Sequence, residues 1–249
     1  MMNKYFNVCL EFDADRVDEI IQSTIATNGK GYVCSVESNN LTYANKHPDF
    51  MQVVNGALVN ICDGSNIAWL LGKIYRKPYK PYIGADLFIK YVQKRCYKQY
   101  FLGNTHLVLD SLKEKLSQID PQINDMPFEE LPFRRVNEFD YPVIASKINR
   151  EKPDIIWVSL GAPKQEQFMN LLLPHIEQGV MFGFGAIFNF YAGTGTVKRA
   201  PAWMRKMRLE WLFRAYEEPK KNVPRYWNFI KILPKLVYSE YKKKRQARF

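Results

Sequence analysis

The sequence is poor in the residues that build metal centres and disulfide frameworks. Its three histidines are scattered, and its four cysteines include no CxxC pair. We therefore expect no metal site, and we expect free, buried thiols in a reducing cytoplasm. The cysteines concerned are Cys9, Cys34, Cys62 and Cys96.

Long apolar runs are also missing, and we expect no leader. Runs such as Pro153–Ala162 and Val180–Ala186 are too short to cross a bilayer. The N-terminal residues Met1–Tyr5 contain one lysine and no apolar stretch, so we expect no secretory signal.

Two common enzyme signatures are absent. The segment Gly183-Phe-Gly-Ala-Ile-Phe188 lacks the third glycine of the dinucleotide fingerprint and lies late in the chain, so we do not expect an NAD enzyme. No serine or cysteine has the context of a nucleophile elbow.

The positive charge is concentrated at the C-terminal end. The net charge of the 249 residues is +11. Residues 197–249 hold 16 Lys and Arg against 4 Asp and Glu, whereas the preceding 196 residues hold 20 against 21. The composition therefore predicts a core domain over residues 1–196 and a cationic appendage over residues 197–249.

Strand-like and helix-like segments alternate along the core, which predicts an α/β fold with a mainly parallel, doubly wound sheet. The predicted strands are Phe6–Phe12, Gly31–Ser35, Leu58–Cys62, Tyr100–Leu102, Phe133–Glu138, Ile155–Leu160 and Val180–Gly185. The predicted helices are Ala14–Thr27, Asn40–Asn45, Pro48–Asn55, Gly64–Leu71, Gly84–Tyr97, Thr105–Leu116, Pro142–Asn149 and Pro163–Leu173.

The appendage has the composition of a helical membrane-surface segment. We predict a helix over Pro201–Glu217 and a second over Arg225–Tyr241 that breaks at Pro234. Aromatic and aliphatic residues interleaved with lysines suit contact with anionic lipid, here through Trp227, Phe229, Ile230 and the terminal lysines. No nucleic-acid-binding motif accompanies the charge, so we expect no nucleic-acid partner.

Four predicted strands end in glycine turns, and in such folds ligands bind beyond these strand ends. The turn Gly161-Ala-Pro-Lys-Gln-Glu166 combines backbone N–H groups, a lysine and a glutamine, which suits an anionic or nucleotide-like ligand. Asp63, before Gly64, has two interpretations: a helix N-cap or a general base. Asp13-Ala-Asp15 likewise fits a helix N-cap or the DxD metal element of some sugar-nucleotide transferases.

Together these motifs resemble those of the bacterial WecG/TagA/CpsF glycosyltransferase family, from about Val33 to Tyr226. The matching motifs are Asp63-Gly64, Gly84-Ala-Asp-Leu87, Leu102-Gly103, Gly161–Glu166, Lys198-Arg-Ala-Pro-Ala-Trp-Met204, Leu209-Glu-Trp-Leu-Phe-Arg214 and Glu218-Pro219. The resemblance implies a Rossmann-like core and an inverting, metal-independent enzyme without a cofactor. Its donor would be a UDP-sugar carrying a hexose or an N-acetylhexosamine such as N-acetylmannosamine. Its acceptor would be a polyprenyl-diphosphate-linked sugar of surface polysaccharide or capsule synthesis.

The resemblance also implies roles for residues. Asp63 would be the base, with Gln165 in the site and Arg214 of the appendage over the leaving diphosphate. We add Ser35 to this catalytic set. The predicted substrate-binding residues are Glu37, Gly64, Asp86, Gly103, Asn104, Gly161, Ala162, Pro163, Lys164, Glu166, Gly185, Lys198 and Arg199. The appendage would close the site at the inner face of the cell membrane, where we expect a peripheral protein; homo-oligomerisation stays open.

The chain departs from the family pattern at positions that line the predicted crevice. Ser35-Val-Glu37 stands where the family has Thr-x-Asn, Pro81 stands where an arginine is expected, with Lys80 as a substitute, and Asn189 stands for a frequent aspartate. These departures leave the donor sugar and the acceptor open. Two other functions also stay open: a metal-dependent transferase that uses Asp13 and Asp15, and a non-catalytic polyanion-binding module.

Overall fold

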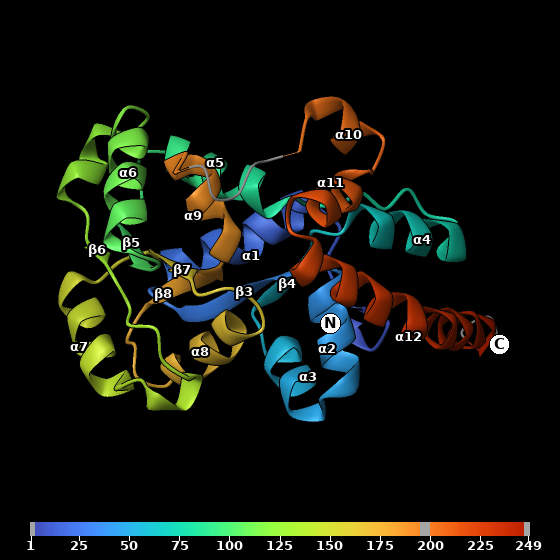
Figure 1. Cartoon of the computed structure of the whole chain (residues 1–249). Helices are drawn as coiled ribbons and strands as arrows, with labels where there is room; N and C mark the ends of the chain where they lie inside the picture. The colour runs from blue at the N-terminus through green and yellow to red at the C-terminus, as the bar shows by residue number, and fades with distance from the viewer. Residues whose placement is uncertain (1–2, 195–199, 247–249) are drawn as a thin grey trace.

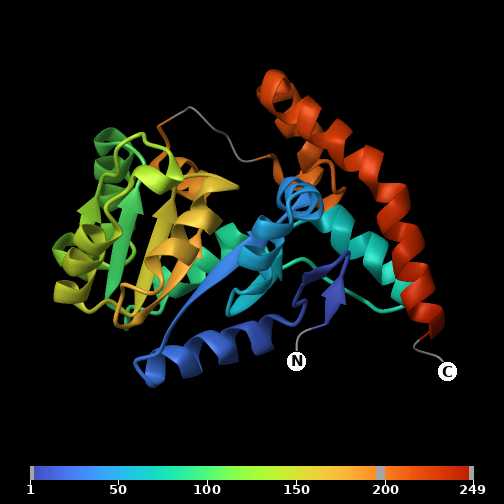
Figure 2. The same ribbon diagram turned by 90° about the horizontal axis from the view of Figure 1, so that it is seen from below.

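A computed structural model describes residues 3–194 and 200–246. Its centre is a six-stranded sheet in the order β4-β3-β8-β7-β5-β6, in which every neighbouring pair is parallel (Figure 2). The strands are β3 (Lys30–Val36), β4 (Val59–Cys62), β5 (Gln99–Gly103), β6 (Phe128–Glu129), β7 (Ile155–Ser159) and β8 (Gly179–Gly183). The predicted parallel sheet is confirmed.

Helices cover both faces of this sheet, because successive strand residues point to opposite sides and both sides are apolar. Trp157 and Phe182 belong to one core cluster, whereas their neighbours Val158 and Met181 belong to the other. The first cluster is covered by α1 (Ala14–Ala26), α5 (Gly84–Gln93), α6 (His106–Ser117) and α9 (Gly185–Ala192). The second is covered by α2 (Ser38–Lys46), α3 (Pro48–Asn55), α4 (Ser65–Tyr75), α7 (Tyr141–Glu151) and α8 (Lys164–Leu172). The fold is therefore Rossmann-like and doubly wound (Figure 1).

The N-terminal segment differs from the prediction of one strand over Phe6–Phe12. It forms a small antiparallel hairpin of β1 (Lys4–Tyr5) and β2 (Val8–Cys9). Phe6 and Asn7 turn the chain with φ values of 50° and 68°, which an extended strand does not allow.

The predicted strand over Phe133–Glu138 is also wrong. The edge strand β6 lies earlier, and Val136–Glu138 forms a 3₁₀ turn, η2. The Glu138 carboxylate accepts a hydrogen bond from the Arg135 backbone N–H at 2.9 Å, which stabilises the turn instead of an extended segment. A second 3₁₀ turn, η1, spans Pro121–Asp125.

The C-terminal region is helical, as predicted, but its helices are divided differently. The predicted helix over residues 201–217 is two helices, α10 (Ala202–Lys206) and α11 (Glu210–Glu217), separated by Arg208 with a φ of 61°. In contrast, α12 (Pro219–Gln246) runs through Pro234 without the predicted break. It packs against α2 and α4 (Figure 2).

Two further sequence predictions have mixed outcomes. Cys9, Cys34 and Cys62 are buried free thiols, but Cys96 is exposed because it lies in the turn that leads into β5. Within residues 3–194 and 200–246, no helix combines the length and the apolar character needed to span a membrane.

Candidate active site

Four glycine turns meet at one edge of the sheet, because β4, β5, β7 and β8 all run in the same direction. Gly103 and Gly161 have φ values of 95° and 76°, a region that favours glycine. A Cβ atom on Gly185 would lie 2.6 Å from the backbone nitrogen of Gly161. The turns after β7 and β8 therefore touch, and this close approach explains the glycines that resembled a dinucleotide fingerprint.

Asp63 lies at this edge and is held by two donors. The Ser35 hydroxyl donates to Asp63 Oδ2 at 2.7 Å, and the Gly84 backbone N–H donates to Oδ1 at 3.3 Å. The N-cap of α4 is Gly64, and no side chain caps that helix. The N-cap interpretation of Asp63 is therefore wrong, and its carboxylate faces Ser35 and the start of α5 instead.

The surroundings of Asp63 bring its pKa towards neutrality. Burial is the largest cause and raises the pKa to about 6, although the hydrogen bonds from Ser35 and Gly84 lower it. The charges of Glu210 and Glu37 raise it further. A carboxyl group with such a pKa can accept a proton and release it near physiological pH.

Glu37 adds a second carboxylate to the crevice. It directly precedes α2, does not cap that helix, and accepts a hydrogen bond from the Ser38 hydroxyl at 3.0 Å. Its charge acts on Asp63, Glu166 and Tyr226, whose pKa values it raises. Glu37 therefore contributes negative charge to the crevice, and its role in substrate binding stays a prediction.

Gln165 does not offer a free amide to a substrate. Its Oε1 accepts from the backbone N–H groups of Gly161 and Gly185 at 3.1 and 2.9 Å. Its Nε2 donates to the carbonyl of Gly183 at 2.7 Å and to Glu166 Oε1 at 3.1 Å. All four hydrogen-bonding positions of the amide are used, so Gln165 braces the two turns rather than contacting the reacting atoms.

Three predicted binding residues lie at the turns but are bonded within the protein or fully enclosed. Asn104 donates to the Ser159 hydroxyl at 3.1 Å and accepts from Thr105 N–H at 3.0 Å. The Lys164 ammonium lies 5.3 and 5.0 Å from the ring centres of Phe133 and Phe139, and burial lowers its pKa. Glu166 is fully buried, so its prediction as a direct substrate contact is wrong.

The remaining predicted residues are placed as follows. Gly64, Ala162 and Pro163 are half-buried in the turns, whereas Asp86 is exposed in the first turn of α5. Lys198 and Arg199 lie outside the described residues.

The C-terminal helices reach the crevice. The Arg214 guanidinium lies 4.5 Å from the ring centre of Phe190 in α9, and its Nη2 is 3.6 Å from Glu210 Oε1. Burial raises the pKa of Tyr226 in α12 to about 12, and the charges of Glu37 and Glu210 add to this effect. The opposing charges of Arg214 and Arg225 also act on Tyr226, so residues from the N-terminus of α2, from α11 and from α12 share one electrostatic environment.

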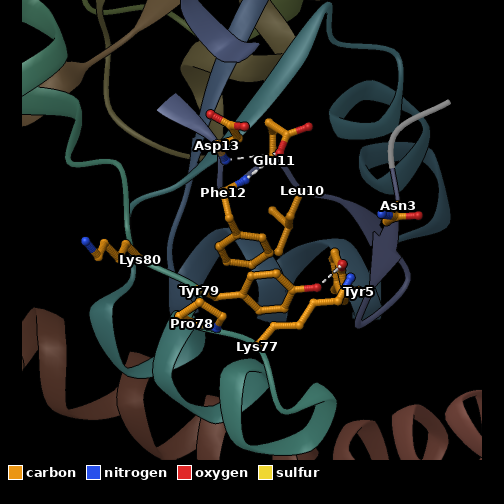
Figure 3. A pocket seen from close by; sticks show the side chains of 10 residues that line it. All are labelled: Asn3, Tyr5, Leu10, Glu11, Phe12, Asp13, Lys77, Pro78, Tyr79 and Lys80. Carbon is orange, nitrogen blue, oxygen red and sulfur yellow. Dashed lines mark hydrogen bonds between the residues drawn. The ribbon is translucent and has the colours of Figure 1, made fainter. Parts of the chain in front are cut away.

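Asp13 and Lys80 line a pocket that does not include Asp63. They border an open pocket of about 380 Å³ in which Phe12 and Tyr79 stack at 4.3 Å (Figure 3). Asp13 accepts from the N–H groups of Asp15 and Arg16 at 3.0 and 3.4 Å, so it caps α1. None of the predicted catalytic or substrate-binding residues lines this pocket.

The parallel sheet, Asp63 at its edge and the cationic C-terminal helices agree with the family that the motifs indicate. The sequence profile of the glycosyl transferase WecG/TagA/CpsF family matches residues 7–248. The chain belongs to this family. The WecG/TagA/CpsF match makes the protein a glycosyltransferase, so the non-catalytic polyanion-binding alternative is wrong.

Two relatives from the same family illustrate the similarity. The N-acetylglucosaminyldiphosphoundecaprenol N-acetyl-beta-D-mannosaminyltransferase of Staphylococcus aureus (strain MW2) is 25% identical over 244 residues, which cover 93% of this chain and 91% of the relative. The protein of the same name from Bacillus spizizenii (strain ATCC 23059 / NRRL B-14472 / W23) is 27% identical over 208 residues, which cover 82% and 76% respectively.

The sequence did not single out several residues that shape this site. Gly84 binds Asp63 through its backbone, Asn40 binds Glu166, and Phe190 supports Arg214. Of these, only Gly84 lay in a recognised motif. The Glu210–Arg214 pair was visible from its i,i+4 spacing, but its place beside Asp63 depends on tertiary structure.

Proposed function

We propose that this glycosyltransferase moves a hexose or an N-acetylhexosamine from a UDP-sugar to a polyprenyl-diphosphate-linked acceptor in surface polysaccharide synthesis. The names of the relatives support an N-acetylmannosamine-like donor sugar and an N-acetylglucosamine-diphosphate lipid acceptor. The observation that carries the proposal is Asp63, held by Ser35 and Gly84 at the edge where four glycine turns meet.

In this mechanism Asp63 accepts the proton of the acceptor hydroxyl while the hydroxyl oxygen attacks the anomeric carbon. The bond from that carbon to UDP breaks on the opposite face, so the configuration inverts and UDP leaves. Ser35 holds the Asp63 carboxylate in place through Oδ2. Arg214, together with Lys198 and Arg199, would offset the charge that develops on the leaving diphosphate.

The test of this proposal is Asp63→Asn. We expect turnover to fall on the order of 10²–10⁴-fold, the range for one acid–base group, because the amide cannot accept the proton. The assay is UDP release from UDP-N-acetylmannosamine with a polyprenyl-diphosphate N-acetylglucosamine acceptor, after a thermal-shift screen of UDP-sugars. Asp110→Asn, on the exposed face of α6, is the matched control. Normal turnover in a folded Asp63→Asn protein would refute the assigned base.

We further propose that the reaction does not require a metal. Asp13 is engaged as the cap of α1, which favours the metal-free site over the DxD alternative. The same UDP-release assay in excess EDTA separates the two mechanisms. Full activity supports the proposal, and loss of activity that a divalent cation restores would favour the alternative.

We propose that residues 197–249 also bring the enzyme to the inner face of the membrane as a peripheral protein. An exposed apolar stripe runs along α12: Val223, Trp227 and Ile230 are spaced by four and three residues, and Tyr238 and Tyr241 follow about two turns later. Phe229 instead packs against the core, and Lys243 and Lys244 donate hydrogen bonds within the protein. The stripe therefore replaces Phe229 and these two lysines as the proposed lipid contact.

Flotation with vesicles containing phosphatidylglycerol tests the stripe. We expect the double variant Trp227→Ser, Ile230→Ser to float several-fold less than the unaltered chain, since both side chains are more than half exposed and available to lipid. Leu107→Ser, an exposed apolar residue of α6, is the control. Equal flotation of all three proteins would contradict the proposed contact.

A further inference from the structure

Glu166 is a buried carboxyl group for which the mechanism above has no use. It lies in the first turn of α8, directly after Gln165, and its exposed fraction is 0%. A buried carboxylate is costly unless charged or polar partners satisfy both of its oxygens. The hydrogen-bond partners of the two Glu166 oxygens therefore indicate whether this carboxyl group is ionised or protonated.

The partners of Glu166 satisfy only one oxygen. Asn40 Nδ2 donates to Glu166 Oε1 at 2.8 Å, and Gln165 Nε2 donates to the same atom at 3.1 Å. Glu166 Oε2 and Asn40 Oδ1 are both buried and have no hydrogen-bond partner. If Glu166 is ionised, both of these atoms can only accept hydrogen bonds. Asn40 and Glu166 are then joined by one hydrogen bond, and each keeps one buried oxygen without a donor.

A proton on Oε2 removes this conflict. A carboxylic acid has one O–H donor, and Asn40 Oδ1 is a buried acceptor that has no donor. The Glu166–Asn40 pair can then exchange two hydrogen bonds, with Asn40 donating to Oε1 and Glu166 donating to Asn40 Oδ1. Leaving both buried oxygens without a donor would instead destabilise the pair.

The charges around Glu166 favour the same state. The ionisable groups that act on it are Glu37, whose negative charge opposes ionisation, and the buried Cys34 thiol. Burial is the largest cause of the raised pKa of Glu166, which reaches about 7. No described cation is paired with this carboxyl group.

The position of this pair links the two halves of the crevice. Asn40 belongs to α2, which follows the strand that carries Ser35 and begins directly after Glu37. Gln165, bonded to Glu166, holds the turns that contain Gly161, Gly183 and Gly185. Glu166 is thus the point at which α2 is joined to the turns after β7 and β8.

We propose that Glu166 is a positioning residue that acts as a neutral acid, and that its proton, shared with Asn40, holds α2 and the two glycine turns in the geometry the active site needs. Ionisation of Glu166 would break this link and leave a buried negative charge under the crevice. The effect on turnover rests on the proposed function, but the protonation state does not.

The first test measures the protonation state directly in the unaltered protein. Infrared spectra of the full chain should show the carbonyl band of a protonated carboxylic acid at pH 6 that disappears as the pH rises through about 7. Asp63, whose pKa is about 6, adds a band of its own, so Glu166→Gln should lose only the part of the signal that disappears through about pH 7. A spectrum without such a band at pH 6, or with a band that Glu166→Gln leaves unchanged, would overturn the proposal.

The second test uses the pH profile of UDP release. We expect activity to fall above about pH 7 in the unaltered enzyme, as Glu166 ionises. Glu166→Gln should keep near-normal activity and lose this alkaline fall, because its amide donates to Asn40 without titrating. Glu166→Ala should lose at least tenfold at every pH. Glu177→Gln, on the exposed segment before β8, is the control.

The outcomes separate this inference from the proposed function. If Glu166→Gln keeps the alkaline fall of the unaltered enzyme, the positioning role is wrong even where Asp63→Asn is inactive. If Asp63→Asn is active while the infrared band titrates as expected, the assigned base is wrong and the neutral state of Glu166 stands.

Discussion

The floor and the cover of the active site are built in different ways. The floor consists of the strand ends and their turns, where every residue of β5, β7 and β8 is buried. The cover consists of α10, α11 and α12, and within their described residues only Asn222, Leu236 and Glu240 are buried. One catalytic crevice is therefore shared by a densely packed region and a thinly packed one.

The two regions also differ in what holds them. The floor is stabilised by contiguous apolar packing, whereas the cover joins that packing only along one side of α12, through Phe229, Ile232, Leu236 and Val237, and otherwise makes a few polar contacts. Among the polar contacts are the hydrogen bond from Phe6 N–H to Glu240 Oε1 at 2.9 Å and the Arg214 guanidinium 4.5 Å from the ring centre of Phe190. Segments with few buried contacts open at lower free energy than the core does. We therefore expect the cover to leave the crevice without unfolding of the floor.

The largest difference should appear when a tryptophan is removed from each region. Trp157 in β7 is fully buried between Phe88 and Phe182, so Trp157→Ala should lower the free energy of unfolding by about 3–5 kcal/mol. Trp227 in α12 is 59% exposed, so Trp227→Ala should change it by no more than about 0.5 kcal/mol. Urea unfolding followed by circular dichroism measures both values. Similar losses for the two variants would show that the cover is as much part of the folding core as the floor.

A smaller effect is expected at the attachment of α12. Glu240 is fully buried and accepts hydrogen bonds from Phe6 N–H at 2.9 Å, from the Tyr75 hydroxyl and from Lys243. Glu240→Ala leaves these donors without their acceptor, which costs about 1–3 kcal/mol. Because these hydrogen bonds attach α12 to the rest of the protein, limited proteolysis of Glu240→Ala should cut within α12 several-fold faster than in the unaltered protein. The fragment that contains the sheet should stay resistant.

Glu217→Ala provides the matched control for this attachment. Glu217 is exposed on α11, so its loss should leave the cleavage rate unchanged. If Glu240→Ala were cut no faster than this control, another contact would hold α12. Cleavage spread evenly over the sheet and the helices would instead show that floor and cover open together.

The floor is the part of the site that the sequence predicts well. β7 and β8 are short apolar runs that end in glycine, and such local patterns identify a parallel strand and the turn after it. The parallel direction of the strands then places Asp63, Gly103 and Gly161 at one edge without further information. The failures within the core were local too: the hydrogen bond between Arg135 and Glu138 produces a turn where the apolar pattern favoured a strand.

The arrangement of the cover could not be predicted because it depends on contacts distant in sequence. Glu240 looks like an acid within a basic tail, yet its partners include Phe6 and Tyr75. Pro234 predicted a break, but α12 continues as one helix along α2 and α4. The hydrogen bonds of Gln165 could not be predicted for the same reason, since its partners Gly183 and Gly185 belong to the next strand and helix.

The smallest predicted effect is the influence of the cover on the floor through Glu210. The charge of Glu210 raises the pKa of Asp63, although less than burial does. Glu210→Gln removes this charge and keeps an oxygen that can accept from Arg214. With less negative charge nearby, ionisation of Asp63 becomes easier and its pKa falls. In the unaltered enzyme, activity should rise with pH around pH 6, as Asp63 ionises. In Glu210→Gln this rise should occur at a pH lower by on the order of half a unit.

The pH profile of UDP release measures this shift, with Glu217→Gln as the control of equal charge on the same helix. A profile of Glu210→Gln that matches the control would show that Glu210 does not act on Asp63. Repeating the measurement with and without anionic vesicles sharpens the comparison of the two regions. Because Glu210 acts on Asp63 only when α11 covers the crevice, a shift that appears only with vesicles would mean that the membrane, rather than the fold alone, brings the cover onto the floor.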